Sequence, residues 1–395
     1  MIQTSTLKSI SEFIRTGKTP PTQETKYFNG EIQWFTPGDL DKEKYLGKSM
    51  RSLTEASFLD KKATYFPAGT LLVACIGDIG KLGITTQDCS SNQQITGIKP
   101  NISTDVNYLY YWFRHSKMLI QHFANNAVVP IINNGTLEKI KIPLPPLAEQ
   151  KKIASILDAA DSLRQKDQQL IEKYTALSQS LFLEMFGDPV TNPMGWDFSK
   201  IVDLTEGKTL NGFFAKKEHY VEEGVPIVWI TDFINKIYVN TEGLRKVNIK
   251  EDDISKYKLA YGDVLFCRSS LTVEGIGKCA IVPKSIAQDV LFECHIIKVR
   301  LGNKVIPEYF RFLSNTSYFR SKIMKNAKTS TMTTISQEGI TNIFIPVPPI
   351  SLQNQFAERI QFIEAQKQQA LISLQKSEAL FNSLLQRAFK GELTV

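Results

Sequence analysis

Two long stretches of the chain carry apolar residues at alternating spacings of three and four. In residues 148–187 the stripe consists of Ile153, Ile156, Ala160, Leu163, Asp167, Leu170, Tyr174, Leu177 and Leu181, and in residues 351–395 of Phe356, Ile360, Ile363, Lys367, Ala370, Leu374, Ser377, Phe381, Leu384 and Ala388. This heptad spacing is typical of paired helices, although one such stripe could also pack on a globular core. Two stripes in one chain favour mutual pairing, so we predict an antiparallel coiled coil of two long helices.

The two remaining parts, residues 1–147 and 188–350, mix the signatures of strands and helices. Short runs rich in β-branched residues follow glycine turns, and longer aromatic-rich segments have helical spacing: 70–76 and 264–267 for the strands, 108–123 and 307–324 for the helices. This mixture predicts an α/β (α+β) fold with an irregular sheet.

The chain also repeats itself. Ile142-Pro143-Leu144-Pro145-Pro146-Leu147 returns as Ile345-Pro346-Val347-Pro348-Pro349-Ile350, and each copy is followed at the same offset by a glutamine, Gln150 or Gln353. Upstream, the letters pair Gly17 with Gly207, Trp34 with Trp229, Gly80-Lys81 with Gly277-Lys278 and Tyr108 with Tyr309. Repeats of this length indicate a duplicated domain. We therefore divide the chain into two domains of similar fold, 1–147 and 188–350, each followed by a long helix, 148–187 and 351–395.

Composition and charge restrict the class of protein. The chain has 395 residues, of which 42% are hydrophobic and 22% charged, as in an ordinary globular protein. Its apolar runs are far shorter than the roughly 18 residues of a membrane span, and its N-terminus lacks the apolar centre of a signal peptide. We expect a cytoplasmic protein with no membrane contact. The formal charge of +7 permits a polyanionic partner.

The sequence lacks complete motifs for catalysis and for metal binding. Five cysteines without a C-x-x-C pair predict buried thiols, and the four histidines form no metal-binding pattern. The glycine that a phosphate-binding loop needs before Gly17-Lys18-Thr19 is replaced by Glu12, and before Gly207-Lys208-Thr209 by Val202. No G-x-S-x-G motif and no methyltransferase tetrapeptide are present. We therefore predict a chain that is not an enzyme and has no catalytic, cofactor-binding or metal-binding residues of its own.

Small polar and basic residues gather on the loops that follow the predicted strands. They are Lys81, Asn92, Gln93 and Gln94 in the first copy and Arg268, Ser269, Ser270 and Lys278 in the second. Arg, Asn and Gln can form paired hydrogen bonds with base edges, whereas Lys and Ser suit phosphates. A solvated loop is the alternative for each residue. The duplicated position of Lys81 and Lys278 favours a shared structural or phosphate-binding role.

Taken together, these motifs resemble the specificity subunit of type I restriction-modification systems over essentially the whole chain. The resemblance is carried by residues 142–150 at the start of the first long helix, Met185-Phe186-Gly187-Asp188-Pro189 at its end, residues 345–353 at the start of the second, and Phe389-Lys390-Gly391-Glu392-Leu393. The repeated tryptophan and Gly-Lys-Thr elements are similar to those of the family's target recognition domains.

The resemblance implies a non-catalytic subunit that binds double-stranded DNA. Each recognition domain would read one half of a split target, and the coiled coil would set the spacing and dock two methyltransferase subunits. Translocase-nuclease subunits would join for cleavage, and S-adenosylmethionine would bind to the methyltransferase partner. Two alternatives remain: the recognition region of a self-contained methyltransferase-nuclease, and a coiled-coil scaffold that does not bind DNA.

Overall fold

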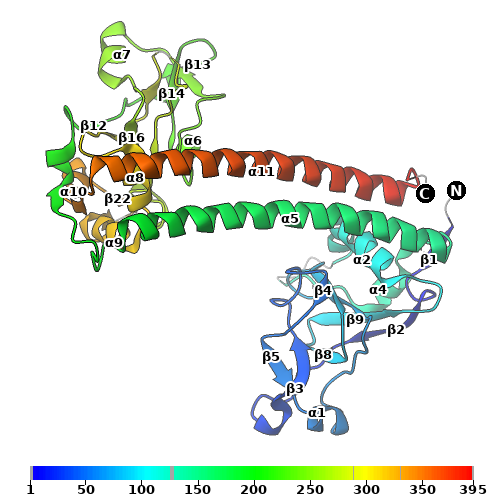
Figure 1. Cartoon of the computed structure of the whole chain (residues 1–395). Helices are drawn as coiled ribbons and strands as arrows, with labels where there is room; N and C mark the ends of the chain where they lie inside the picture. Colours follow the sequence, from blue (N-terminus) through cyan, green and yellow to red (C-terminus); the bar gives the residue numbers. More distant parts are fainter. Residues whose placement is uncertain (1–2, 125–128, 288, 330, 394–395) are drawn as a thin grey trace. The chain divides into compact units, whose positions relative to one another are not determined.

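A computed structural model describes residues 3–124, 129–287, 289–329 and 331–393. The chain folds as two units, one formed by the residues up to Gln168 together with those from Leu371 onward, the other by Gln169–Ala370. Both units contain parts of two long helices, α5 (Leu147–Phe186) and α11 (Ile350–Lys390) (Figure 1). Within the described residues, none of the helices combines the length and hydrophobicity that a bilayer crossing requires.

The first unit is built on two β-sheets. The larger has the order β2-β9-β6-β7-β4 and contains β2 (Ser11–Thr16), β9 (Ile95–Pro100), β6 (Leu71–Ala74), β7 (Leu82–Thr85) and β4 (Tyr45–Leu46). The smaller has the order β5-β3-β8 and contains β5 (Arg51–Leu53), β3 (Phe28–Phe35) and β8 (Cys89–Ser91). Neighbouring strands are antiparallel except for the parallel pairs β4–β7 and β3–β8. A separate pair joins β1 (Thr4–Thr6) to β10 (Lys141–Pro143).

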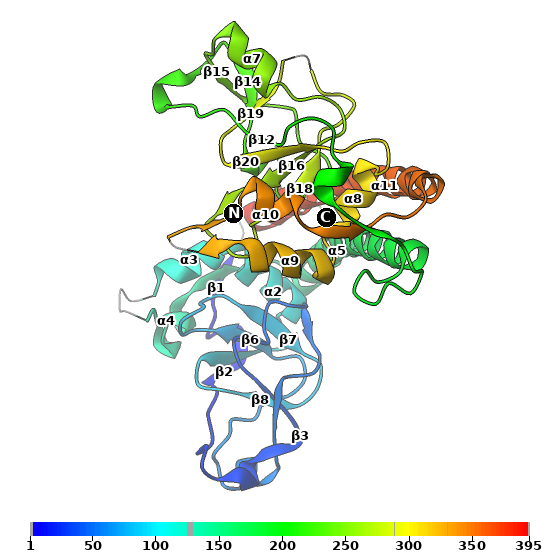
Figure 2. The same ribbon diagram turned by 90° about the vertical axis from the view of Figure 1, so that its left-hand side faces the viewer.

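Short helices accompany the two sheets of the first unit. They are η1 (Thr25–Tyr27), α1 (Ala56–Leu59), α2 (Val106–His115), α3 (Lys117–His122) and α4 (Asn134–Lys139). Helix α2 packs beside β6 and β7 (Figure 2), and Tyr108, Tyr111 and Phe113 are fully buried there. The Tyr111 ring lies 6.1 Å from that of Phe381 on α11. One hydrophobic core therefore runs from the sheet through α2 to the two long helices.

The second unit repeats this plan with mostly shorter strands. Its main sheet contains β12 (Leu210–Asn211), β20 (Ile296–Arg300), β16 (Asp263–Cys267) and β18 (Cys279–Ile281), and another contains β13 (Tyr220–Val221), β15 (Arg245–Val247), β14 (Val225–Val228) and β19 (Leu291–Phe292). The smaller sheets contain β17 (Ser269–Ser270), β22 (Thr333–Thr334) and β21 (Lys328–Thr329), and β11 (Phe198–Lys200) with β23 (Phe344–Pro346). Its helices are η2 (Ile201–Leu204), η3 (Lys217–His219), α6 (Ile230–Phe233), α7 (Glu251–Tyr257), α8 (Pro307–Leu313), α9 (Ser317–Asn326) and α10 (Gln337–Thr341).

The repeated glutamines are structural clamps at the starts of the two long helices. Gln150 is fully buried, and its Oε1 accepts a hydrogen bond of 2.9 Å from the backbone N–H of Asp105, which caps α2. Gln353 does the same for Ile306 before α8, at 2.8 Å. Each amide group also donates to two backbone carbonyls at 2.7–3.0 Å. The predicted duplication is thus confirmed at the level of individual hydrogen bonds.

The two long helices pair antiparallel in each unit, as the sequence predicts. The predicted stripe of α11 is confirmed, but that of α5 is wrong at Leu163, Leu170 and Leu177. Leu163, Leu170 and Leu177 are exposed by 46%, 41% and 50%, because the helix turns the next residue of each heptad toward its partner. Two of the residues that do face the partner, Asp167 and Ser178, are polar.

Backbone hydrogen bonds correct two of the residue pairs that the sequence alone matches between the two repeats. Gly17 donates to the carbonyl of Ile95 at 2.9 Å, and the residue that makes the same bond to Ile296 is Gly212, five positions after Gly207. A Cβ at Gly17 or Gly212 would lie within 2.3 Å of a backbone oxygen in the loop after β8 or β19, so both positions require glycine. The two tryptophans are likewise not equivalent, because the β14 residue in the position of Trp34 is Ile227.

Candidate nucleic-acid interface

Loops at one end of the sheets bring the predicted contact residues together in each unit. In the first unit β3, β6 and β8 end there and β7 and β9 begin there; in the second, β14, β16 and β19 end and β18 and β20 begin. This common edge follows from the strand directions, since β3 and β8 are parallel while β6 is antiparallel to both β7 and β9. All eight residues predicted from the sequence lie in the segments between these strands, with Lys81 and Lys278 directly before β7 and β18.

In the first unit, residues 92–94 form a tight turn that Asn92 holds in place. Asn92 is buried, and its Oδ1 accepts the backbone N–H of Gln94 at 3.1 Å while its Nδ2 donates to the Gln94 side chain at 2.8 Å. Gln93 is exposed and accepts a hydrogen bond from the Thr19 hydroxyl. The turn therefore has one positioning residue, Asn92, and two side chains that a ligand can reach.

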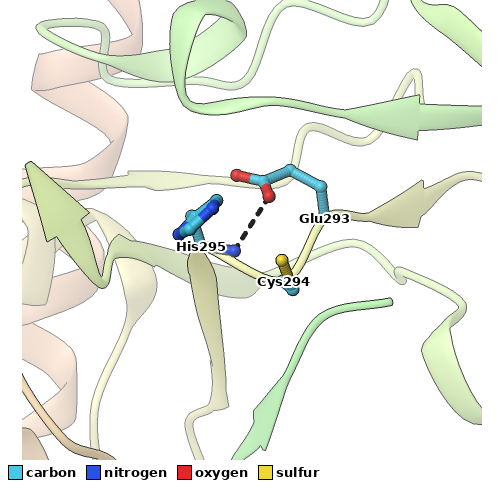
Figure 3. A group of neighbouring side chains, drawn as sticks. All are labelled: Glu293, Cys294 and His295. Carbon is cyan, nitrogen blue, oxygen red and sulfur yellow. Dashed lines mark hydrogen bonds between the residues drawn. The ribbon is translucent and has the colours of Figure 1, made fainter. Parts of the chain in front are cut away.

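The second unit has the same turn with different chemistry. Glu293 takes the place of Asn92: its carboxylate accepts the backbone N–H of His295 at 2.9 Å (Figure 3). Its own N–H donates to Val228 at 3.1 Å, as that of Asn92 donates to Phe35 at 3.0 Å. The sequence does not identify Glu293, Cys294 and His295 as equivalent to residues 92–94. An amide and a carboxylate can both accept this bond, so the residue types differ although the backbone hydrogen bonds are the same.

These three side chains bring possible metal-binding atoms within 4.8 Å of one another. The carboxylate of Glu293 already closes the turn, however, and the guanidinium of Arg268 donates to the Cys294 carbonyl at 3.2 Å. Because the first unit forms the same turn with amide side chains, we assign the group to the turn rather than to a metal. Burial raises the pKa of the Glu293 carboxyl above its usual value, and the nearby His295 and Arg268 oppose that change.

The remaining predicted residues occupy the loops after β6 and β16. The backbone N–H of Arg268 donates to the His295 carbonyl at 2.8 Å, so Arg268 supports the turn through both its backbone and its side chain. Ser269 is buried in β17 opposite Thr334, whereas Ser270 is partly exposed.

The duplicated lysines share a backbone position but not a side-chain partner. Lys81 accepts the N–H of Ala74 with its carbonyl oxygen and Lys278 that of Cys267, at 2.8 Å in both units. The ammonium of Lys81 pairs with Asp78 at 2.8 Å, while that of Lys278 donates to the Asn235 side chain. Their equivalence is therefore established for the loop, not for the charged groups.

Open cavities lie beside β5 in the first unit and beside β15 in the second. In the first unit a cavity of about 490 Å³ is lined by Thr36, Pro37, Gly38, Met50, Arg51, Gly77, Asp78, Asn92 and Gln94. In the second, one of about 790 Å³ is lined by Ala215, Lys217, Tyr220, Val221, Glu222, Trp229, Arg245 and Lys246. The arginines were missed from sequence because they belong to the strands β5 and β15, outside the loops that the repeated motifs mark.

Comparison with known proteins gives consistent matches over nearly the whole chain. The family model of the type I restriction modification DNA specificity domain matches residues 2–173 and 193–378. The chain is 24% identical to the type I restriction enzyme MjaIX specificity subunit of Methanocaldococcus jannaschii, over 98% of this chain and 93% of that protein. It is 26% identical to the EcoKI specificity subunit of Escherichia coli K12, over 70% of this chain and 62% of that protein.

Solved structures share the fold. The crystal structure of the type I restriction-modification S subunit from M. genitalium has a TM-score of 0.61 at 15% identity, covering 98% of this chain and 96% of that one. A structure described as the basis of complex assembly and conformational transition of a type I restriction-modification system has a TM-score of 0.54 at 15% identity, covering 99% and 98%.

Proposed function

The chain belongs to the family of type I restriction-modification DNA specificity domains, and we propose that it selects the DNA sequence on which such a complex acts. The observation that carries the proposal is the duplicated set of strand-end loops, with the turns at residues 92–94 and 293–295 built on the same backbone hydrogen bonds. Each unit would read one half of a split, double-stranded target. Because the side chains of the two turns differ, the two half-sites should differ in sequence.

We further propose that the long helices set the gap between half-sites and dock two methyltransferase subunits. Each unit supports this with exposed apolar side chains on its own helix segments: Leu163, Leu371, Ile372 and Leu380 in the first unit, and Leu170, Leu177 and Phe362 in the second. Leu177 and Leu380 occupy the same position in the two repeats and are exposed by 50% and 48%. Two matching faces suit two copies of one partner.

In this scheme the chain itself catalyses no reaction and works in the cytoplasm. Methylation, with S-adenosylmethionine, would belong to the docked methyltransferase, and cleavage to translocase-nuclease subunits that join the complex. The two rival functions give different results in one assay series. A self-contained methyltransferase-nuclease would bind S-adenosylmethionine by itself, and a scaffold that does not bind DNA would show no steep loss of DNA affinity with salt.

Selection from a random duplex library tests the proposal. The full chain, co-purified with its methyltransferase, is expected to enrich two short sequence elements separated by a fixed number of unread base pairs. Its affinity should fall steeply with salt, because phosphate contacts release counterions. Enrichment of one continuous element, or of none, would contradict the proposal, as would crosslinking of S-adenosylmethionine to the purified chain alone.

Arg268→Ala and Lys278→Ala test whether the two units recognise their half-sites independently. Removal of Arg268 loosens the turn at residues 293–295, so the base preferences of one half-site should change while those of the other stay intact. A lost base contact typically costs about 1–3 kcal/mol at the affected position. Equal changes in both half-sites would show that the units do not read separately. Lys304→Ala, which removes an exposed charge at the opposite end of β20, is the matched control.

A further inference from the structure

Arg51 and Arg245 occupy the same position in the two repeats. In the first unit Arg51 on β5 lies opposite Trp34 on β3, and the residue after Trp34 accepts the N–H of Asn92 with its carbonyl oxygen. In the second, Arg245 on β15 lies opposite Ile227 on β14, and the next residue accepts the N–H of Glu293. Two separate registers therefore make the arginines equivalent, although no sequence motif connects them.

Both guanidinium groups are available to a ligand. Arg51 and Arg245 are exposed, and each lines an open cavity, which in the first unit also includes Asn92 and Gln94 of the turn. Among the residues that the structure describes, no carboxylate pairs with either one. The cations predicted from the sequence differ in this respect, since Lys81, Arg268 and Lys278 all have polar partners within the protein.

The surroundings of the two arginines differ even though their position does not. Arg245 lies over the ring of Trp229, with its Cζ 4.1 Å from the ring centroid. The residue equivalent to Trp229 in the first unit is Thr36, because each donates its N–H to an aspartate three residues later, at 2.7 and 2.8 Å. The second cavity holds three cations, Lys217, Arg245 and Lys246, against the single carboxylate of Glu222.

A side chain that stays the same while its neighbours change suits a ligand feature that is common to both half-sites. The sugar-phosphate backbone is that feature in duplex DNA, whereas base edges differ from site to site. An unpaired guanidinium gives up no internal ion pair when it binds a phosphate, and it can form two charge-assisted hydrogen bonds with it.

We propose that Arg51 and Arg245 are equivalent phosphate anchors, one in each unit, that hold the DNA against the turns at residues 92–94 and 293–295. This inference rests on the proposed function and adds to it a pair of positioning contacts that do not read sequence. The neighbouring residues, Thr36 in one unit and Trp229 in the other, are then free to differ with the bases that each unit reads.

The test compares Arg51→Ala, Arg245→Ala and the two Arg→Lys variants in the full chain co-purified with its methyltransferase. The probes are the duplex enriched by selection and a scrambled duplex of equal length. Each alanine variant should weaken binding to both duplexes by about tenfold, because it removes charge-assisted hydrogen bonds. It should also reduce the slope of log affinity against log salt by about one. The lysine variants should regain part of the affinity, since lysine also binds phosphate, although as a point charge.

Matched controls are Lys141→Ala in the first unit and Lys304→Ala in the second, which remove an exposed charge away from the cavities and should leave binding unchanged. Unchanged binding in the alanine variants would overturn the inference and leave the proposed function intact. A loss confined to one base pair, not regained by lysine, would overturn the phosphate assignment in favour of base reading. Absence of an enriched sequence with the unaltered chain would instead refute the proposed function.

Discussion

Asp167 of α5 accepts a hydrogen bond from Ser377 of α11, with Oδ2 and Oγ 2.8 Å apart inside the helix pair of the first unit. Ser373, one turn earlier on α11, donates to the same carboxylate at 3.0 Å. Asp167 and Ser377 are both buried. This polar contact between the helices penalises any sliding of one along the other, because sliding would leave the carboxylate without its donors.

We expect Ser377→Ala to lower the free energy of unfolding by about 1–3 kcal/mol, since the buried carboxylate loses a hydrogen-bond donor. Urea denaturation followed by circular dichroism measures the change. Ser383→Ala, at an exposed position on the same helix, should have almost no effect. Equal losses in the two variants would show that Asp167 does not depend on this contact.

The glutamine clamps give a second stability prediction. Gln353→Leu removes the acceptor for the Ile306 N–H and the donor to two carbonyls, all of them buried or partly buried. Groups left unpaired cost roughly 1–3 kcal/mol each, so the second unit should lose at least about 2 kcal/mol. Hydrogen exchange of amides in α8 and β20 would report the loss. Asn354→Leu, at the exposed neighbouring position, is the control and should leave exchange unchanged.

The long helices show how far the apolar pattern can be read. Ala160, Asp167 and Tyr174 are predicted to face the partner helix, and the structure leaves none of the three exposed. The prediction is wrong at Leu163, Leu170 and Leu177 because these leucines continue the heptad spacing, although they lie one residue away from the surface that contacts the partner helix. Leucine and isoleucine identify the contact surface of a helix pair only when every position on that surface is apolar. Here Asp167 and Ser178 occupy two of those positions. A tertiary hydrogen bond from Ser377 supports Asp167, whereas Ser178 donates to the Tyr174 carbonyl of its own helix. Apolar periodicity reveals neither contact.

The candidate interface shows a second limit. Sequence alone locates the loops, because glycines and strand patterns mark where strands end. It aligns the repeats incorrectly at Trp34 and at Gly17, because identical residue types recur nearby by chance. It also misses pairs of different residue types, such as Asn92 and Glu293, that occupy the same backbone position. Arg51 and Arg245 emerge only when strand registers are compared, because neither arginine lies beside a repeated motif.

Stability should depend on pH through Glu293. Burial raises the pKa of its carboxyl in the folded protein, so the protonated form is favoured by folding. Its contribution is fully present below the ordinary pKa of 4.5 and is lost as the pH rises through the raised value. Glu293→Gln keeps an acceptor for the His295 N–H without the charge. This variant should therefore be more stable than the unaltered chain at pH 7–8.

Urea midpoints measured from pH 4 to pH 8 test this expectation. The advantage of Glu293→Gln should shrink toward zero at the acid end, where the natural side chain is also neutral. Glu222→Gln, which changes an exposed carboxylate in the same unit, should give no such trend. A difference that stays constant across the range would mean that the effect comes from side-chain shape rather than from titration.

The matching exposed leucines predict the composition of the complex. Leu177→Glu and Leu380→Glu should each reduce the number of bound methyltransferase subunits from two to one, because a charge disrupts an apolar contact on one face only. Native mass spectrometry counts the subunits. Gln179→Glu and Asn382→Glu place the same charge on the opposite flank of each helix and should keep two copies bound. If the unaltered chain forms only a one-to-one complex, two equivalent docking faces do not exist.

Length of the helix pair should control the gap between half-sites. Inserting one heptad with leucines at its two seam positions, after Ile171 in α5 and after Ile372 in α11, keeps the apolar seam in phase. These positions leave Asp167, Ser373 and Ser377 together, so the polar contact still fixes the register. Seven residues add about 10 Å of helix at 1.5 Å per residue. At about 3.4 Å per base pair, the preferred gap should grow by up to three base pairs.

Selection from the random duplex library measures the new gap. The two half-site sequences should be unchanged, because the insertions do not alter the strand-end loops of either unit. Three added base pairs also rotate one half-site by roughly a third of a turn of DNA, given 10–10.5 base pairs per turn. A gap that grows by fewer base pairs, with weaker binding, would show the helix pair resisting that rotation. Tight binding at the original gap by a folded variant would show that something other than helix length sets the spacing.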